Sequence, residues 1–450
     1  MSAVPAASSA EPDLPVQIGK YRVLSKLGEG ATSEVFLARD EFANREVAIK
    51  RVRSGFMTDS RESHFQQRFF AAEAALVGRL QHPNVVQIFD AVSDDVAPYL
   101  VMEHVPGSTL RRFCRADALL PLEQIVEVGF KCAMALDYMF RQGLIHRDVK
   151  PANLLAVFDG EHITDVKITD FGSVFNFASE RTQVYRVGSL AYMSPEQLDG
   201  DALDCRADIY SLAAVLYHLI AGRPPFDALQ QPAIINQIYT AEPPRLGTLR
   251  EGVSPALEAL IHGALNKQRD QRPATWNDFA QALSALVANR DVPRGGTLQG
   301  VLDSERFNLL RKLDFFSGFG DVELWEVVRR ARWQRFPFGH ALYRKGEEGN
   351  TFHIIALGQV DVYRDGQRVA QLGAGTSVGE MAYLAPSPDL RAHSTDILVA
   401  DPVTSISFTP ATLQQLSINT RHLFDEAFIR VLVRRLHAAH ETLAHPRRIL

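Results

Sequence analysis

An ordered series of short motifs constrains the fold of this 450-residue chain more than any other feature. A glycine-bearing turn, "GEGATSEV", is followed along the chain by "VAIK", "IHRDVKPANLL", "ITDFGS", "YMSPEQ" and "RDQRP". Any one of these motifs could occur by chance, because each is short. Six of them in this order are far more specific, so we expect them to belong to one domain.

The first two motifs predict strands. "YRVLSKLGEGATSEVFLARD" is typical of two strands joined by a turn, where Gly28 and Gly30 let backbone N–H groups approach a phosphate closely. In "REVAIKRV", the alternation of a strand places Ala48 and Lys50 on the same face. In the segment that follows, apolar residues recur at helical spacing from Phe65 to Leu80, which places Glu73 beside the apolar stripe. A carboxylate there needs a cation, and Lys50 is the candidate.

The series resembles that of the eukaryotic-like (Hanks-type) serine/threonine protein kinases of bacteria, over about residues 18–287. The resemblance implies a bilobal kinase fold that uses ATP and Mg²⁺ to phosphorylate proteins. A transferring phosphoryl group spreads negative charge over its oxygens, so its site needs metal ions, cations and a positioned nucleophile. The chain departs from the family pattern at Ser33, where the third glycine of the loop usually stands.

The resemblance also implies residue roles. Lys50 would hold the ATP phosphates and be oriented by Glu73, while Asp148 would accept or orient the proton of the substrate hydroxyl and Lys150 would steady the γ-phosphate. The implied metal ligands are Asn153 and Asp170. Met102 would be the gatekeeper and 103–105 the hinge, so the implied ATP-binding residues are Gly28, Gly30, Val35, Ala48, Lys50, Met102, Glu103 and Val105.

Several neighbouring residues refine this prediction. Lys150 and Ser189 are similar to residues that favour serine or threonine as acceptor. Arg147 resembles the arginine of kinases whose activation segment is ordered by a phosphate, which makes Thr182, or else Ser179, a predicted autophosphorylation site. Structural roles are expected for three further features, which are a packed His146, a buried Glu196–Arg272 ion pair and an Asp208 that braces the catalytic loop.

The last third of the chain changes in pattern. Residues 288–302 read as a polar, glycine-bearing linker, and 303–440 as a second domain. Helical periodicity gives way there to short alternating runs, with a hairpin signal at Asp365-Gly366. The chain is therefore predicted to be an α+β multidomain protein whose second domain is a small β-barrel or jelly roll with flanking helices.

This second domain resembles the cyclic-nucleotide-binding domain in "FFSGFGDVEL", "KGEEGNTFHIIALGQVDVY" and "VGEMAYLAPSPDLRAHS". The resemblance implies that Gly379 and Ala382 offer backbone donors, that Glu380 accepts from the ribose 2′-hydroxyl and that Arg391 pairs with the phosphate. Ala392, next to Arg391, resembles the residue of cyclic-AMP sites more than that of cyclic-GMP sites, so cyclic AMP is the expected ligand. The path from Glu380 to Arg391 is a couple of residues longer than is common in the family, so a degenerate barrel that binds nothing is the alternative.

Composition limits the remaining possibilities. The 48 Lys and Arg residues nearly balance 53 Asp and Glu, which gives no general case for binding nucleic acid. No run of about 18 apolar residues predicts a membrane span, and three scattered cysteines favour reduced thiols in the cytoplasm. Residues 1–17 have the composition of a disordered leader.

The resulting hypothesis is a cytoplasmic serine/threonine protein kinase regulated in cis by a cyclic nucleotide. One alternative is a pseudokinase scaffold, which the presence of Lys50, Asp148 and Asp170 argues against. The other alternative is a kinase for a small molecule. The "SPE" ending of the activation segment and the pair Lys150 and Ser189 favour a protein acceptor instead.

Overall fold

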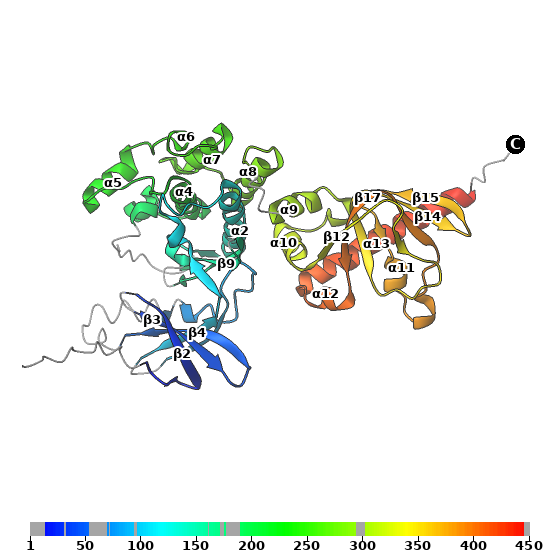
Figure 1. The fold of residues 1–450 in the computed structure, drawn as a ribbon, viewed down its shortest axis with the longest axis horizontal. Helices are drawn as coiled ribbons and strands as arrows, with labels where there is room; N and C mark the ends of the chain where they lie inside the picture. Colours follow the sequence, from blue (N-terminus) through cyan, green and yellow to red (C-terminus); the bar gives the residue numbers. More distant parts are fainter. Residues whose placement is uncertain are drawn as a thin grey trace, which may run out of the picture. The chain divides into compact units, whose positions relative to one another are not determined.

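The computed structural model describes residues 14–30, 33–53, 70–71, 73–93, 97–160, 162–171, 175–176, 190–293 and 302–444. The chain divides into two compact units, 1–297 and 298–450, which Figure 1 shows in blue to green and in yellow-green to red. Three residues with predicted roles in the activation segment lie outside the described residues, namely Ser179, Thr182 and Ser189. So does most of the predicted leader.

The first unit begins with a six-stranded antiparallel sheet in the order β1-β2-β3-β4-β6-β5. Its strands are β1 (Gln17–Ile18), β2 (Tyr21–Glu29), β3 (Ser33–Asp40), β4 (Arg45–Val52), β5 (Ile88–Val92) and β6 (Tyr99–Glu103). The two strands predicted on either side of the turn at Gly28 and Gly30 are confirmed as β2 and β3, while residues 31–32 of the turn lie outside the described residues. One face of the sheet is a hydrophobic cluster that includes Phe36, Val47 and Ile49, as the alternation of these strands predicts.

The helix predicted to run to Leu80 ends earlier. Residues 70–71 and 73–74 are helical, but 75–79 form turns. The N–H of Gly78, which has a φ of 69°, donates to the carbonyl of Ile88 instead of continuing a helix. The left-handed backbone of this glycine turns the chain toward β5, so Leu80 is buried from a loop and not from a helix.

Helices make up most of the second lobe of this unit (Figure 1). They are α2 (Leu122–Arg141), α3 (Pro195–Asp199), α4 (Cys205–Ala221), α5 (Gln231–Thr240), α6 (Leu246–Leu249), α7 (Pro255–Ala264) and α8 (Trp276–Ala288). The α2 helix packs against α4 and α8 and is buried along nearly its whole length. Side chains cap the free N–H groups at the starts of α4, α7 and α8, where the capping residues are Asp204, Ser254 and Thr275.

Short strands and 3₁₀ turns position the polar motifs between the two lobes. The strands form two small sheets, β10-β9-β7 and β11-β8, from β7 (Gly107–Thr109), β8 (Leu144–Ile145), β9 (Leu154–Asp159), β10 (His162–Ile168) and β11 (Phe175–Asn176). The described residues of this unit also form the 3₁₀ turns η2 (Leu110–Phe113), η3 (Pro151–Asn153), η5 (Leu190–Tyr192) and η6 (Arg269–Gln271). The "IHRDVKPANLL" segment therefore runs from β8 through η3 into β9, so its charged residues lie in the loop between two paired strands.

The second unit is a β-rich fold with flanking helices, as predicted. Its antiparallel sheet has the order β12-β17-β14-β15, with β13 added to β17 and β16 added to β14. These strands are β12 (Arg332–Phe336), β13 (Ala341–Tyr343), β14 (Phe352–Arg364), β15 (Gln367–Leu372), β16 (Ser377–Val378) and β17 (Asp396–Phe408). The predicted hairpin turn is confirmed between β14 and β15, where Asp365 and Gly366 have φ values of 51° and 81°.

Helices and turns complete the second unit. They are α9 (Asp303–Arg311), η7 (Asp314–Phe316), α10 (Asp321–Arg330), α11 (Glu380–Tyr383), η8 (Pro388–Leu390), α12 (Pro410–Gln414) and the long α13 (Ile418–Ala444). The rings of Phe424 and Phe428 on α13 pack against Phe315 of η7 and Phe352 of β14. This aromatic cluster fixes α13 on the sheet. Within the described residues, no helix is both long and apolar enough to cross a membrane.

Candidate functional site

Lys50 lies at the centre of the first group of charged side chains. Its Nζ donates to Glu73 Oε1 at 2.8 Å and Oε2 at 3.1 Å, as the sequence predicts. It also donates to Asp170 Oδ1 at 2.8 Å, a pairing that the sequence did not indicate. Burial alone would lower the pKa of Lys50, but the carboxylates of Asp170 and Glu73 raise it above its ordinary value. The lysine therefore stays a cation.

The two carboxylates around this lysine differ in environment. The positive charge of Lys50 holds the pKa of Asp170 well below its usual range. Burial raises the pKa of Glu73, while its ion pair with Lys50 opposes that rise. Glu73 is 4% exposed, whereas the side chain of Asp170 is 38% exposed. Of the two carboxylates, Asp170 is thus the one that remains open to a ligand.

A second group of side chains comes from the catalytic-loop motif around η3. The Nζ of Lys150 donates to Asp148 Oδ2 at 2.7 Å. The Nδ2 of Asn153 donates to the same Oδ2 at 3.1 Å and to the Asp148 carbonyl at 2.8 Å. The carbonyl of Asn153 in turn accepts from the N–H of Thr169, next to Asp170. The two groups are therefore joined through the backbone.

A buried aspartate holds this loop in place, and two residues of the site have uncommon backbone angles. Arg147 and Asp170 adopt left-handed φ values of 67° and 66°, which are uncommon for residues with side chains. The carboxylate of Asp208 in α4 accepts from the N–H groups of His146 at 2.7 Å and Arg147 at 2.8 Å. The bracing role predicted for Asp208 is confirmed, and His146 is 1% exposed and packs edge-on against Phe171.

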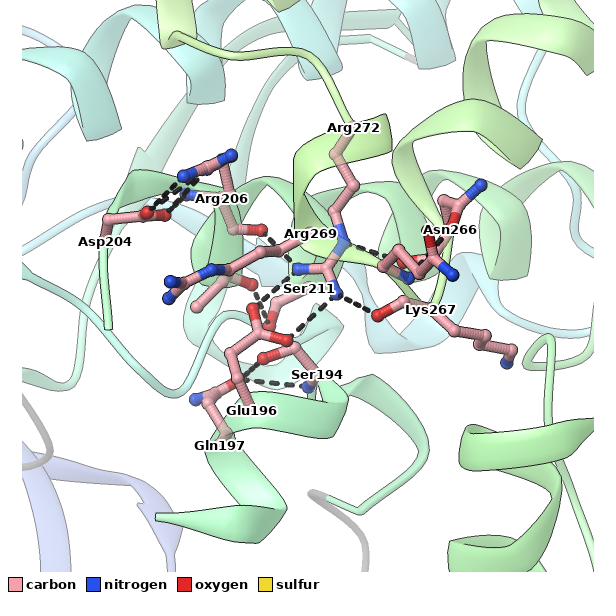
Figure 2. A network of polar contacts seen from close by, with 12 residues as sticks. Ser194, Glu196, Gln197, Asp204, Arg206, Ser211, Asn266, Lys267, Arg269 and Arg272 are labelled. Carbon is pink, nitrogen blue, oxygen red and sulfur yellow. Dashed lines mark hydrogen bonds and ion pairs between the residues drawn. The ribbon is translucent and has the colours of Figure 1, made fainter. Parts of the chain in front are cut away.

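The predicted pair of Glu196 and Arg272 is also confirmed (Figure 2). The guanidinium donates two hydrogen bonds to the carboxylate, at 2.6 and 2.9 Å. Its other donors reach the backbone carbonyls of Arg206, Asn266 and Lys267. Next to it, Ser194 and Gln197 form a capping box at the start of α3. One buried arginine thus ties α3, the start of α4 and the loop before α8 together.

The strand register places the remaining predicted ATP-binding residues near Lys50. Val35 of β3 lies opposite Lys50, and Ala48 lies opposite Met102 of β6. Gly28 pairs with Val35, and the N–H of Gly30 donates to the Ser33 carbonyl at 2.8 Å.

The hinge segment follows β6 directly. The carboxylate of Glu103 pairs with Lys167 of β10 at 2.9 Å, and Val105 is 9% exposed. The side chain of Glu103 is therefore occupied, which leaves the backbone of this segment as the part that could meet a ligand.

The candidate metal ligands are one amide and one carboxylate, Asn153 and Asp170. Among the described residues there is no cluster of three or more His, Cys, Asp or Glu side chains that could hold a metal alone. A site with few protein oxygens suits Mg²⁺, which keeps several waters and shares phosphate oxygens. The residues present therefore fit an ion that arrives with a phosphate ligand.

The second unit presents a different candidate site at α11. Gly379, with a φ of 82°, precedes this helix and lies against the Tyr343 hydroxyl, where a larger residue would not fit. Glu380 and Ala382 are 1% and 3% exposed. The Nη1 of Arg435 in α13 donates to Glu380 Oε1, and its Nη2 donates to the Ser377 carbonyl at 2.7 Å. No pattern in the sequence singles out Arg435, because the basic residues of α13 indicate only a polar face.

Arg391 is half-buried and is held through its backbone. Its carbonyl accepts from the N–H of Gly349 at 3.1 Å, and Ala392 forms a bridge with Glu348. Within the described residues, the structure joins the guanidinium to no partner and does not link it to Glu380. Gly379, Glu380 and Ala382 thus come together at α11. Arg391 lies on the neighbouring segment, and among the described residues its guanidinium makes no ion pair.

Comparisons with known proteins agree with this division of the chain. Residues 21–285 match the model of the protein kinase domain, and residues 333–419 match that of the cyclic nucleotide-binding domain. Similar proteins include the serine/threonine-protein kinase PknB of Mycobacterium leprae, 35% identical over 57% of this chain and 41% of the relative. PknB of Mycobacterium tuberculosis is 33% identical over 65% of this chain and 46% of the relative.

A probable serine/threonine-protein kinase of Streptomyces coelicolor is 35% identical over 61% of this chain and 41% of the relative. The chain therefore spans less than half the length of these curated relatives.

Proposed function

Because this chain belongs to the protein kinase domain family, we propose that it transfers the γ-phosphoryl group of ATP to serine or threonine hydroxyls of proteins. The observation that carries this proposal is the geometry of two linked charge groups. Lys50 is fixed by Glu73 and Asp170, and Asp148 is fixed by Lys150 and Asn153. These groups supply the cations, metal ligands and base that phosphoryl transfer requires.

Each group has a distinct task in the proposed mechanism. Lys50 contacts the ATP phosphates, and its two carboxylate partners hold its Nζ in place. Asn153 and Asp170 would hold Mg²⁺, which would neutralise charge on the phosphate oxygens. Asp148 accepts or orients the proton of the acceptor hydroxyl.

Lys150 donates to Asp148 at 2.7 Å and would approach the γ-phosphate when nucleotide is bound. The identity of the acceptor follows from Lys150 and Ser189, which resemble the residues of serine/threonine kinases. The relatives at about 35% identity, which are serine/threonine-protein kinases by name, support the same acceptor class. The intact Lys50, Asp148 and Asp170 argue against a pseudokinase scaffold.

Replacement of Asp148 by Asn tests this function. Asn has nearly the same shape but cannot take up the hydroxyl proton, so phosphate transfer should fall by about 10² to 10⁴, the usual contribution of a general base. ATP binding should change little, because Asp148 is not among the proposed ATP-binding residues. The measurement is transfer of labelled phosphate from Mg²⁺-ATP to the chain itself and to a generic protein substrate.

Asp159→Asn provides the matched control, since Asp159 is an exposed carboxylate at the end of β9. Its transfer rate should equal that of the natural chain. Turnover that survives in Asp148→Asn would remove this residue from its proposed role. If the natural chain binds ATP but transfers no phosphate, the result would support the pseudokinase scaffold instead.

For the second unit, we propose that residues 333–419 bind a cyclic nucleotide and regulate the kinase in cis. The αL turn at Gly379 and the start of α11 suit the phosphate, Arg391 would pair with it and Glu380 would accept from the ribose 2′-hydroxyl. Cyclic AMP is the first candidate ligand. Regulation further requires that the ligand bind two conformations with different affinity, because otherwise it shifts no equilibrium.

Two measurements on the full chain test this second proposal. Calorimetric titration should detect binding of cyclic AMP or cyclic GMP, with linear 5′-AMP as the control ligand. Autophosphorylation should then change at saturating cyclic nucleotide. Binding without any change in rate would retain the site but reject the regulation.

A further inference from the structure

Arg435 clamps the turn that leads into α11. Its Nη1 donates to Glu380 Oε1 and its Nη2 to the carbonyl of Ser377, so one guanidinium holds both ends of the Ser377–Glu380 turn. The Glu380 side chain is 1% exposed, and that of Arg435 is 41% exposed. A planar, forked donor fixes the orientation of a carboxylate in a way that a flexible ammonium cannot. The rotamer of Glu380 is therefore set by a residue of the tail helix.

This clamp leaves one carboxylate oxygen of Glu380 unused. In the described part of the chain, Glu380 Oε2 is buried and has no hydrogen-bond partner, and the same holds for Ser377 Oγ. The nearby Tyr343 hydroxyl is not the missing donor, since it donates to the Thr351 carbonyl at 2.8 Å. A buried acceptor without a donor is unfavourable, so this oxygen is suited to accept from a hydroxyl that a ligand brings.

The position of Arg435 is fixed by the packing of α13. About two turns earlier on the same helix, the Phe428 ring centroid lies 6.2 Å from that of Tyr383 of α11 and 4.9 Å from that of Phe352 of β14. Arg430 donates to the Phe315 carbonyl at 3.4 Å. The helix is thus tied to the sheet and to α11 before it reaches Glu380, which gives Arg435 a defined place.

We infer that Arg435 is the positioning residue that makes Glu380 a reader of the ribose 2′-hydroxyl, by occupying Oε1 and leaving Oε2 for the ligand. This inference rests on the proposed binding of a cyclic nucleotide. It assigns part of the specificity to a residue outside 333–419, the segment that matches the cyclic nucleotide-binding domain. Arg435 itself touches Glu380 and not the ligand.

The experiment compares cyclic AMP and cyclic GMP with their 2′-deoxy counterparts, by calorimetric titration of the full chain. A hydrogen bond to a charged group should make the natural chain bind the 2′-deoxy compound at least about tenfold more weakly. The ratio of the two dissociation constants, 2′-deoxy compound to parent nucleotide, should approach one in Arg435→Gln, because Glu380 loses the partner that orients it. Arg435→Lys should retain part of the ratio, since an ammonium can still reach one of the two acceptors.

Arg434→Gln is the matched control. Arg434 is the preceding residue, is 68% exposed and lies 3.9 Å from Asp314 instead of near α11. Its ratio should equal that of the natural chain. In Glu380→Gln the ratio should already be low, and adding Arg435→Gln should lower it no further, because the two residues act as one unit.

Four outcomes would overturn the inference. An equal loss of affinity for both compounds in Arg435→Gln, with the ratio unchanged, would make Arg435 merely structural. Tighter binding in that variant would mean that Arg435 competes with the ligand. If Arg435→Gln does not fold, the Arg435→Lys protein becomes the test, and an unchanged ratio in it would refute the inference. Binding of neither nucleotide by the natural chain would refute the proposed ligand, and this inference with it.

Discussion

Replacing Arg272 by Met should strongly destabilise the first unit. The Arg272 side chain is fully buried and that of Glu196 is 9% exposed. Arg272 donates two hydrogen bonds to the Glu196 carboxylate and three to the backbone carbonyls of Arg206, Asn266 and Lys267 (Figure 2). Met has a similar length but no donor, so the charge of Glu196 and the carbonyls lose their partners. Breaking a buried ion pair in this way costs about 3–5 kcal/mol.

Urea unfolding followed by Trp276 fluorescence measures this cost. The chain has three tryptophans, and Trp276 belongs to the first unit and is 2% exposed. Replacing Trp325 and Trp333 by Phe in every protein compared removes the signal of the second unit. The control is Arg269→Met, since Arg269 is exposed and donates one bond to the Ala202 carbonyl at 3.2 Å. It should change the unfolding free energy by no more than about 0.5 kcal/mol.

A second substitution tests the reason for the effect. Glu196→Gln alone should destabilise the natural chain, because it weakens two charge-assisted bonds. In the Arg272→Met background the same substitution should stabilise, since it removes a buried charge that has lost its counter-ion. A loss below about 1 kcal/mol in Arg272→Met would refute the reasoning, and so would the same sign for Glu196→Gln in both backgrounds.

Two further predictions concern the second unit. Arg391→Gln should weaken cyclic-nucleotide binding by about tenfold or more in titration, whereas the exposed Arg344→Gln should not; equal affinities would exclude Arg391 as the phosphate partner. Burial lowers the pKa of His353 to about 4, against about 6.5 when unfolded, so the unfolded chain gains a proton first as the pH falls. The stability present above pH 6.5 should therefore drop by about 3 kcal/mol by pH 4, and in urea unfolding His353→Gln should show a flatter dependence; an identical slope would contradict this.

The charged groups of the first unit were predictable where a local pattern met a chemical need. Strand alternation predicted that Lys50 lies on the face of β4 opposite to Val47 and Ile49. The helical spacing predicted that Glu73 lies beside an apolar stripe. Their ion pair follows because a buried carboxylate requires a cation. The pairing of Lys50 with Asp170 was not predictable in this way, since 120 residues separate them and only the fold brings them together.

The second site shows the same limit more clearly. The Asp365-Gly366 turn was predictable because turn type depends on two adjacent residues. The contact of Arg435 with Glu380 was not, because the periodicity of α13 indicates its apolar face but not which of several arginines reaches α11. The early end of the helix before Leu80 was also missed, since Gly78 and its bond to Ile88 act against an unbroken apolar spacing.

The central position of β17 has a consequence for how the second unit is made. This strand pairs with β12, β13 and β14, and its Ser407 lies opposite Arg332, 75 residues earlier. During synthesis, the earlier strands leave the ribosome before the strand that joins them. Such long-range pairing forms slowly. The Glu380 turn precedes β17 in the chain, so a nascent polypeptide carries this loop before its supporting sheet exists, and the site should appear in one late step.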